Sequence, residues 1–124
     1  MNNILLDTNI ILYAAVYRDE VALDVLNDNN IFISDITEIE LLGYHRINKT
    51  ELSILKNLVS NINVLPINND IKKIAIDIRR KYQLKTPDAI IASTALYFDY
   101  FLATADKKLH KIDEVNLIQF NVDY

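Results

Sequence analysis

Short apolar runs with polar residues at their ends recur along the chain and predict buried strands. These runs cover residues 4–6, 31–33, 63–67, 100–104 and 115–118. A continuous apolar run is typical of a strand that is covered on both faces, as in a parallel sheet. Pro66 cannot donate to a strand ladder, so we expect it at the end of its strand or at the sheet edge.

Helical periodicity fills the segments between these strands. It predicts helices over residues 10–15, 18–26, 36–46, 50–59, 70–82, 87–97 and 106–110. The expected N-caps are Thr8 or Asn9, Ser34 or Asp35, Asn69 or Asp70, and Thr86 with Pro87 in the first helical position. Strands that alternate with helices predict an α/β fold with a mostly parallel sheet covered by helices on both faces.

Composition narrows the chemistry that this chain can perform. Its 124 residues fit one domain, so we treat residues 1–124 as a single unit. The absence of cysteine excludes disulfides and thiolate metal sites, and one glycine is too few for a phosphate-binding glycine loop. Two histidines are too few for a three-histidine zinc site and leave little material for a Ser–His–Asp triad. Any catalysis would therefore depend on carboxylates. We see no targeting or membrane segment and expect a cytoplasmic protein.

Two aspartates follow predicted strands directly. Asp7 comes after the first strand and Asp106 after the fourth, where the ligand crevice of an open parallel sheet lies. In an extended chain Thr104 would point to the same side as Asp106, and Asn9 to the same side as Asp7. Taken singly, an aspartate in such a position is more often a helix cap or a turn residue.

Two further acids fall on helix faces that the pattern predicts to be buried. Glu40 shares a face with Ile36 and Ile39, and Asp88 begins a helix that is apolar almost all round. A buried ionised carboxylate requires a cation, hydrogen-bond donors or a metal ion. If the two helices flank the crevice, the four acids form a cluster whose oxygen ligands favour Mg²⁺ or Mn²⁺ over zinc.

Four segments in this order resemble one known family. They are Ile4-Leu5-Leu6-Asp7-Thr8-Asn9, Ile36-Thr37-Glu38-Ile39-Glu40-Leu41-Leu42-Gly43, Thr86-Pro87-Asp88-Ala89-Ile90-Ile91-Ala92 and Leu102-Ala103-Thr104-Ala105-Asp106. Each segment alone is short, but together they span nearly the whole chain at the expected separations. The chain resembles the PIN-domain ribonucleases, and among them the VapC toxins of bacterial toxin–antitoxin pairs.

This resemblance implies a fold, an activity and a set of site residues. The fold would be a three-layer α/β/α sandwich around a parallel sheet of about five strands. The activity would be Mg²⁺- or Mn²⁺-dependent endonucleolytic cleavage of structured RNA such as tRNA or rRNA, leaving 5′-phosphate and 3′-hydroxyl ends. The metal ligands would be Asp7, Glu40, Asp88 and Asp106, supported by Thr104 and Asn9. Whether one or two ions serve stays open.

The same resemblance implies partners for the chain. These are an RNA substrate, a cognate antitoxin that covers the site, and a second copy in a homodimer. The net charge of −4 is unusual for a nucleic-acid binder, so local basic groups would have to hold the RNA. The candidates, which approach the proposed site in sequence, are Arg79, Arg80, Lys85, Lys107 and Lys108.

Three other interpretations compete with the nuclease. A phosphatase or phospho-acceptor domain would use Asp7 as nucleophile, but Asn9 stands where a second aspartate is expected. A non-catalytic PIN-like module would bind RNA or protein without cutting it. In the third interpretation, Glu40 and Asp88 are buried ion-pair partners of Arg79 or Lys85, and neutralising either acid would destabilise the fold.

Overall fold

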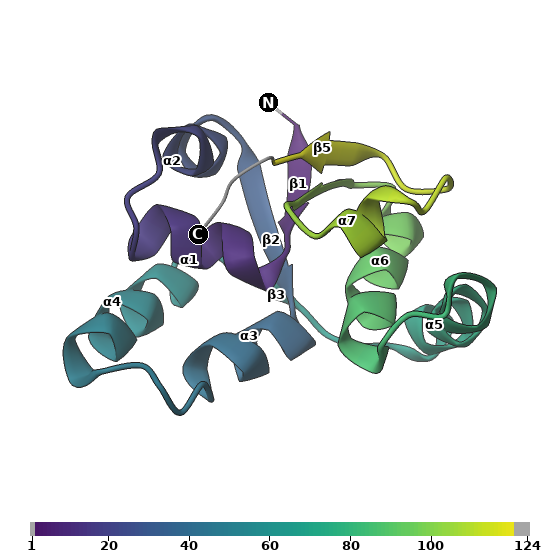
Figure 1. Cartoon of the computed structure of the whole chain (residues 1–124), viewed down its shortest axis with the longest axis horizontal. Coiled ribbons are helices and arrows are strands. Elements are labelled where there is room, and N and C mark those ends of the chain that lie inside the picture. Colours follow the sequence, from purple (N-terminus) through teal and green to yellow (C-terminus); the bar gives the residue numbers. More distant parts are fainter. Residues whose placement is uncertain (1, 121–124) are drawn as a thin grey trace.

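The computed structural model describes residues 2–120, which form an α/β fold of alternating strands and helices (Figure 1). The strands are β1 (Asn3–Leu6), β2 (Asn30–Ser34), β3 (Asn63–Leu65), β4 (Phe101–Thr104) and β5 (Leu117–Gln119). The helices are α1 (Thr8–Ala15), α2 (Glu20–Asp28), α3 (Asp35–Leu42), α4 (Lys49–Val59), α5 (Asn69–Tyr82), α6 (Thr86–Phe98) and α7 (Lys107–His110). None of these helices is long and apolar enough to cross a membrane.

All strand pairs of the sheet are parallel, and the strand order is β3-β2-β1-β4-β5. The first strand lies in the centre, where Ile4 pairs with Ile31 of β2 on one side and with Phe101 of β4 on the other. Pro66 directly follows the edge strand β3, which confirms the expectation for that residue. The order reverses direction between β1 and β4, and this switch point opens a crevice at the carboxyl ends of the two strands.

Two hydrophobic cores cover the two faces of the sheet, so the molecule has three layers. Leu5 and Leu102 pack against α5, α6 and α7, whereas Leu6 and Ala103 pack on the side of α1, α2 and α4. Neighbouring strand residues point to opposite faces, which explains why continuous apolar runs are needed. In Figure 1, α1, α2 and α4 lie on one side of the sheet and α5, α6 and α7 on the other. The predicted three-layer architecture is confirmed.

The third helix is shorter than the periodicity predicts. It ends at Leu42 rather than Arg46, and the C-cap Gly43 leaves helical geometry with φ −93° and ψ 0°. A new helix start competes for the following residues, because Asn48 and Glu51 form a capping box at the beginning of α4. The apolar Ile47 therefore belongs to the connection between two helices and not to the face of α3.

Three predicted N-caps are displaced from their positions in the structure. Asp7, rather than Thr8 or Asn9, caps α1 by accepting a hydrogen bond from Thr8 N. Asn68 caps α5. Thr86 is the first residue of α6, and Lys85 takes the cap position without a side-chain bond. Neighbouring polar residues offer similar capping oxygens, so local pattern leaves the boundary open by one position.

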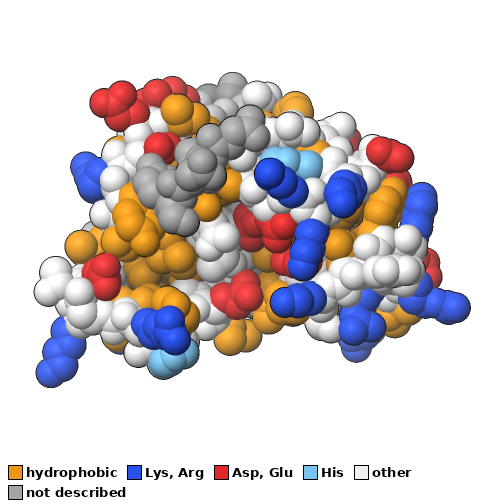
Figure 2. Space-filling model, in the orientation of Figure 1, with side chains coloured by type: hydrophobic (Ala, Val, Ile, Leu, Met, Phe, Trp, Pro, Cys, Tyr) orange, Lys and Arg blue, Asp and Glu red, His pale blue; other side chains and the backbone are white. Residues whose placement is uncertain are grey.

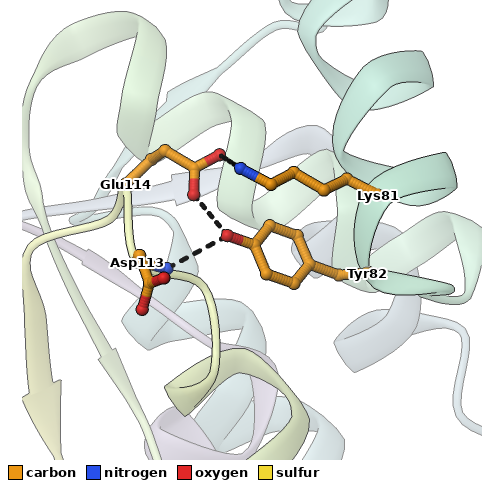
Figure 3. A network of polar contacts seen from close by, with 4 residues as sticks. All are labelled: Lys81, Tyr82, Asp113 and Glu114. Carbon is orange, nitrogen blue, oxygen red and sulfur yellow. Dashed lines mark hydrogen bonds and ion pairs between the residues drawn. The ribbon is translucent and has the colours of Figure 1, made fainter.

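A polar network ties the end of α5 to the loop between α7 and β5 (Figure 3). Tyr82 at the end of α5 donates a hydrogen bond to Glu114, and its own hydroxyl accepts one from Asp113 N at 3.3 Å. Lys81 Nζ forms an ion pair with Glu114 Oε2 at 3.3 Å. These contacts hold the loop that follows α7 against α5, and α7 itself begins at the carboxyl end of β4.

Candidate active site

The candidate site lies where β1 and β4 end side by side. Asp7 directly follows β1, and its backbone N–H donates to the carbonyl of Ala103 in β4 at 3.0 Å. Asp106 lies two residues beyond the end of β4 and caps the short helix α7. The parallel sheet therefore brings together two aspartates that are far apart in sequence, as the position of the switch point predicts.

Asp7 is a buried carboxylate with neutral hydrogen-bond donors. Its side chain is 6% exposed, with Oδ1 accepting from Thr8 N and Oδ2 accepting from Thr104 Oγ1, both at 2.7 Å. Burial raises the pKa of Asp7 from 3.8 to about 6, against the two hydrogen bonds, which lower it. The charges of Asp88 and Asp106 raise the pKa further. Asp7 is therefore a buried acid on which two other acids act, and it lacks an ion-pair partner within residues 2–120.

Thr104 links the two strand-end aspartates. Its Oγ1 donates to Asp7 Oδ2 and also accepts a hydrogen bond from Asp106 N at 3.0 Å. Its carbonyl oxygen lies 2.8 Å from His110 Nε2 and accepts from Phe120 N at 3.0 Å. Thr104 is fully buried, so its position fixes the orientation of the Asp7 carboxylate.

Glu40 reaches the same region from α3, but its environment differs from the prediction. Thr37 and Leu41 form the buried face of this helix, whereas Glu40 is exposed and Ile39 is 64% exposed. The prediction of a buried Glu40 was wrong, because it counted Ile39 and the residues beyond Leu42 as one apolar face. Glu40 Oε1 accepts a hydrogen bond from Thr8 Oγ1 at 2.8 Å. Glu40 is therefore bound to the residue that directly follows Asp7.

Asp88 completes the group from the first turn of α6. It is half-buried, and desolvation raises its pKa, as do the charges of Asp106 and Glu40. The charges of Lys108 and Lys85 act in the opposite direction and lower its pKa. Neither Asp88 nor Glu40 forms an ion pair within residues 2–120. The ion-pair interpretation of these two acids therefore finds no support in the contacts of this structure.

The charges of these carboxylates raise the pKa values of Asp7 and Asp88, but the side chains do not form a ready metal-binding arrangement. Among residues 2–120, no three acidic or histidine side chains converge closely enough to hold a metal ion as they stand. The donor chemistry nevertheless fits a divalent cation, because all four side chains offer hard oxygen atoms. A cation among them would also relieve the mutual repulsion that raises the pKa values of Asp7 and Asp88.

The face around these acids is asymmetric. Acidic side chains lie near the centre of this face, between lysine and arginine side chains on one side and hydrophobic side chains on the other (Figure 2). Lys85, Lys107 and Lys108 are exposed, and two of them act on Asp88. Arg79 lines a separate apolar groove, and Arg80 is exposed on α5. The structure thus relates Lys85 and Lys108 to the acids more directly than either arginine.

On the hydrophobic side a groove of about 400 Å³ begins at the acids. It is lined by Thr8, Asn9, Leu12, Tyr17, Glu40, Leu41, Tyr44 and Ile47. Asn9 lies in α1, where the extended-chain argument does not apply, and its exposed side chain lines this groove instead of bonding Asp7.

Sequence reasoning missed the contact of Thr8 with Glu40 and the two tyrosines of the groove. The residue next to Asp7 was interpreted only as a helix cap. No local pattern signals the tyrosines, because the groove joins α1 to the loop after α3.

The fold and the group of acids define an α/β domain with a carboxylate site at its topological switch point. The family model of the PIN domain matches residues 4–115, and the chain belongs to this family. No curated protein sequence matches the chain.

Solved structures of toxin–antitoxin proteins share this fold. A chain of the toxin–antitoxin complex from Klebsiella pneumoniae is 29% identical, with a TM-score of 0.75 over 90% of this chain and 93% of that chain. VapBC-1 from nontypeable Haemophilus influenzae is 25% identical, with a TM-score of 0.74 over 94% and 97%. DNA-bound VapBC from Salmonella typhimurium is 21% identical, with a TM-score of 0.84 over 96% and 98%, which shows the fold alone.

Proposed function

We propose that the protein is a divalent-metal-dependent endoribonuclease that hydrolyses phosphodiester bonds of structured RNA such as tRNA or rRNA. PIN-domain proteins of the VapC group are generally nucleases, which supports a hydrolase. The observation that carries the proposal is Asp7. This buried carboxylate accepts hydrogen bonds from the Thr8 amide and the Thr104 hydroxyl, is exposed to the charges of Asp88 and Asp106, and has no ion-pair partner in the described region.

Asp7, Glu40, Asp88 and Asp106 would hold the Mg²⁺ or Mn²⁺ ion. When bound, the ion supplies a nucleophile at neutral pH and stabilises negative charge on the phosphate. The burial of Asp7 favours this role, because an ionised carboxylate in a poorly hydrated position gains most from a cation.

Other residues of the chain orient these acids and bind the substrate. Thr104 holds the Asp7 carboxylate, and the Thr8 hydroxyl holds Glu40. Lys85 and Lys108 lie close enough to lower the pKa of Asp88, so their charges also reach a phosphate at the site. Lys107 follows Asp106 directly and adds to this positive side. We assign a weaker contribution to Arg79 and Arg80.

The cellular role that we propose is that of a toxin with a cognate antitoxin. The structural relatives from Klebsiella pneumoniae and Haemophilus influenzae are named as a toxin–antitoxin complex and as VapBC-1, which supports a protein partner of this kind. A homodimer in the cytoplasm is the expected form. A non-catalytic PIN-like binding module is the alternative that a lack of cleavage would favour.

The test is cleavage of a total tRNA and rRNA pool by the purified protein. We expect cuts with Mg²⁺ or Mn²⁺ that leave 5′-phosphate ends, and loss of cutting with a chelator and in the Asp88→Asn variant. Asp19→Asn, which replaces the N-cap aspartate of α2 and leaves the four candidate acids unchanged, serves as the matched control. If every RNA stays intact in the presence of either metal, the nuclease proposal is wrong.

A further inference from the structure

The groove beside Glu40 has a chemistry that the proposed metal site does not use. Its lining includes two tyrosines, Tyr17 and Tyr44, which are 56% and 47% exposed. Aromatic rings beside a proposed RNA-cutting site are natural stacking surfaces for bases. The volume of about 400 Å³ lies in the range of small-molecule sites.

The groove is continuous with the carboxylates. Thr8, which directly follows Asp7, and Glu40 both line it, and a hydrogen bond of 2.8 Å joins their side chains. Tyr13, whose ring centroid lies 6.4 Å from that of Tyr17, has its pKa raised by burial and then by the charge of Asp7. A substrate with its phosphate at the acids would therefore place an adjacent group in this groove.

The charge of the lining decides which group of the substrate fits. None of the eight lining residues is a lysine or arginine, and Glu40 is an acid, so the groove repels a phosphate. Lys85 and Lys108 act on Asp88 of the acidic group, and basic side chains gather next to the acidic centre of the face in Figure 2, where they suit the RNA backbone. An uncharged, flat group that stacks on tyrosine and bonds to the Asn9 amide fits the lining best.

Two neighbouring rings support the tyrosines. The His45 ring packs edge-on against Tyr44, with centroids 5.5 Å apart and an interplanar angle of 68°. Tyr13 packs at a tilt of 48° against Tyr17. Each exposed ring thus has an aromatic neighbour that limits its rotation, which lowers the entropic cost of stacking.

We propose that this groove is a nucleobase subsite, which receives an unpaired base next to the scissile phosphate. The inference rests on the proposed nuclease function and names the substrate feature that this site selects. A base that is already unstacked, as in a loop, enters at little cost, whereas a paired base must first leave its helix. The subsite therefore directs cleavage to loops and other single-stranded positions of a structured RNA.

The experiment compares steady-state cleavage of a stem–loop RNA that contains the cut site of the wild-type protein. We expect Tyr17→Ala and Tyr44→Ala each to raise KM by about 10-fold, within the range for one base–aromatic stack. Tyr17→Phe and Tyr44→Phe keep the ring and retain the wild-type KM. Tyr97→Ala removes an exposed tyrosine of α6 outside the groove and is the matched control.

An abasic nucleotide in the substrate tests for direct contact. Removing the base on one side of the scissile phosphate should raise the wild-type KM by about the same factor. In Tyr17→Ala or Tyr44→Ala the same abasic RNA should cause little further loss, because the stack is already absent. Unchanged KM values in the alanine variants overturn the subsite while leaving the nuclease intact, and would turn attention to a protein partner for the groove.

A binding measurement keeps the two proposals separable if no RNA is cut. The wild-type protein is titrated with adenosine and uridine 3′-monophosphate, and with ribose 5-phosphate as the base-free control, while tyrosine ring signals are followed by NMR. Shifts of Tyr17 and Tyr44 with the nucleotides alone support the subsite even if the nuclease proposal fails. Equal responses to nucleotides and ribose 5-phosphate, or none, overturn it.

Discussion

Thr104 Oγ1 donates a hydrogen bond of 2.7 Å to Asp7 Oδ2, across 97 positions of sequence. The bond joins the end of β4 to the end of β1 inside the protein, at the point between these two strands where the strand order reverses. Two residues that are 97 positions apart in the sequence therefore meet in the candidate site.

Replacing Thr104 by valine should affect both the fold and the proposed activity. The change removes a buried donor to an ionised carboxylate, which costs about 1–3 kcal/mol of unfolding free energy. The pKa of Asp7 should rise further, because the hydrogen bond from Thr104 lowers it. RNA cleavage should fall by about 10-fold or more, in line with the loss of a residue that orients a metal ligand.

Two variants separate this role from general packing. Thr104→Ser keeps the hydroxyl and should retain most activity. Thr94→Val alters a threonine of α6 that is equally buried but bonds only to the carbonyl of Ile90. If Thr94→Val and Thr104→Val reduce cleavage equally, the bond to Asp7 has no special importance.

The titration of Asp7 predicts how the metal-free protein responds to pH. Its pKa is raised from 3.8 to about 6 on folding, so the folded protein binds this proton more tightly than the unfolded chain. The stability that the protonated form contributes is fully present below about pH 4 and is lost as the pH rises through about 6. For a shift of this size the loss is about 3 kcal/mol at most.

Asp7→Asn should therefore stabilise the metal-free protein above about pH 7, by about 1–3 kcal/mol, and flatten the pH dependence. The asparagine can still accept from Thr8 N and contact Thr104. Denaturant unfolding in the presence of a chelator measures the effect, with Asp19→Asn as a control for replacing a capping aspartate. A clear loss of stability in Asp7→Asn would mean that the charge is compensated within the fold.

Much of this architecture can be predicted from the sequence, because it follows from burial. Continuous apolar runs identify strands covered on both faces, and the aspartates that end two of them mark the switch point. Pro66 was predicted to lie at the end of a strand or at the sheet edge, and it directly follows the edge strand β3. The resemblance of four short segments adds the family, and the family model that matches residues 4–115 confirms it.

The failures come from features that local pattern does not contain. Glu40 was expected in the core, but the chain leaves α3 at Gly43, and the helix turns Thr37 and Leu41 inward instead. The groove with Tyr17 and Tyr44 depends on how α1 approaches the loop after α3. Periodicity describes one helix at a time, so it cannot report a surface that two segments share.

The lysine beside Asp88 should affect binding of RNA more than its cleavage. Lys108→Ala removes a positive charge but keeps the backbone bond from Lys108 N to Asp106. We expect KM to rise by about 3- to 10-fold and the slope of log KM against log salt to fall by about one. Lys56→Ala, in the last turn of α4, is the control. Equal effects of both variants would assign no particular role to Lys108.

The network of Tyr82 and Glu114 in Figure 3 should be structural only. Tyr82→Phe removes a hydrogen bond at the surface, which costs about 0.5–1 kcal/mol of unfolding free energy. The bond from Tyr82 is also the main reason that the pKa of Glu114 is lowered, so its stabilisation is lost in acid as the pH falls through that pKa. KM and kcat for RNA should stay at wild-type values, and a changed kcat would link this loop to the site.

The central claim is that the carboxylates of Asp7, Glu40, Asp88 and Asp106 form one divalent-metal site. Calorimetric titration with Mn²⁺ tests it most directly, because it needs no RNA substrate. The account predicts binding by the wild-type protein, loss of that binding in Asp7→Asn and Asp88→Asn, weaker binding in Glu40→Gln and Asp106→Asn, and no change in Asp19→Asn. Wild-type protein that binds no Mn²⁺, or that binds it unchanged after Asp7→Asn, would contradict the account.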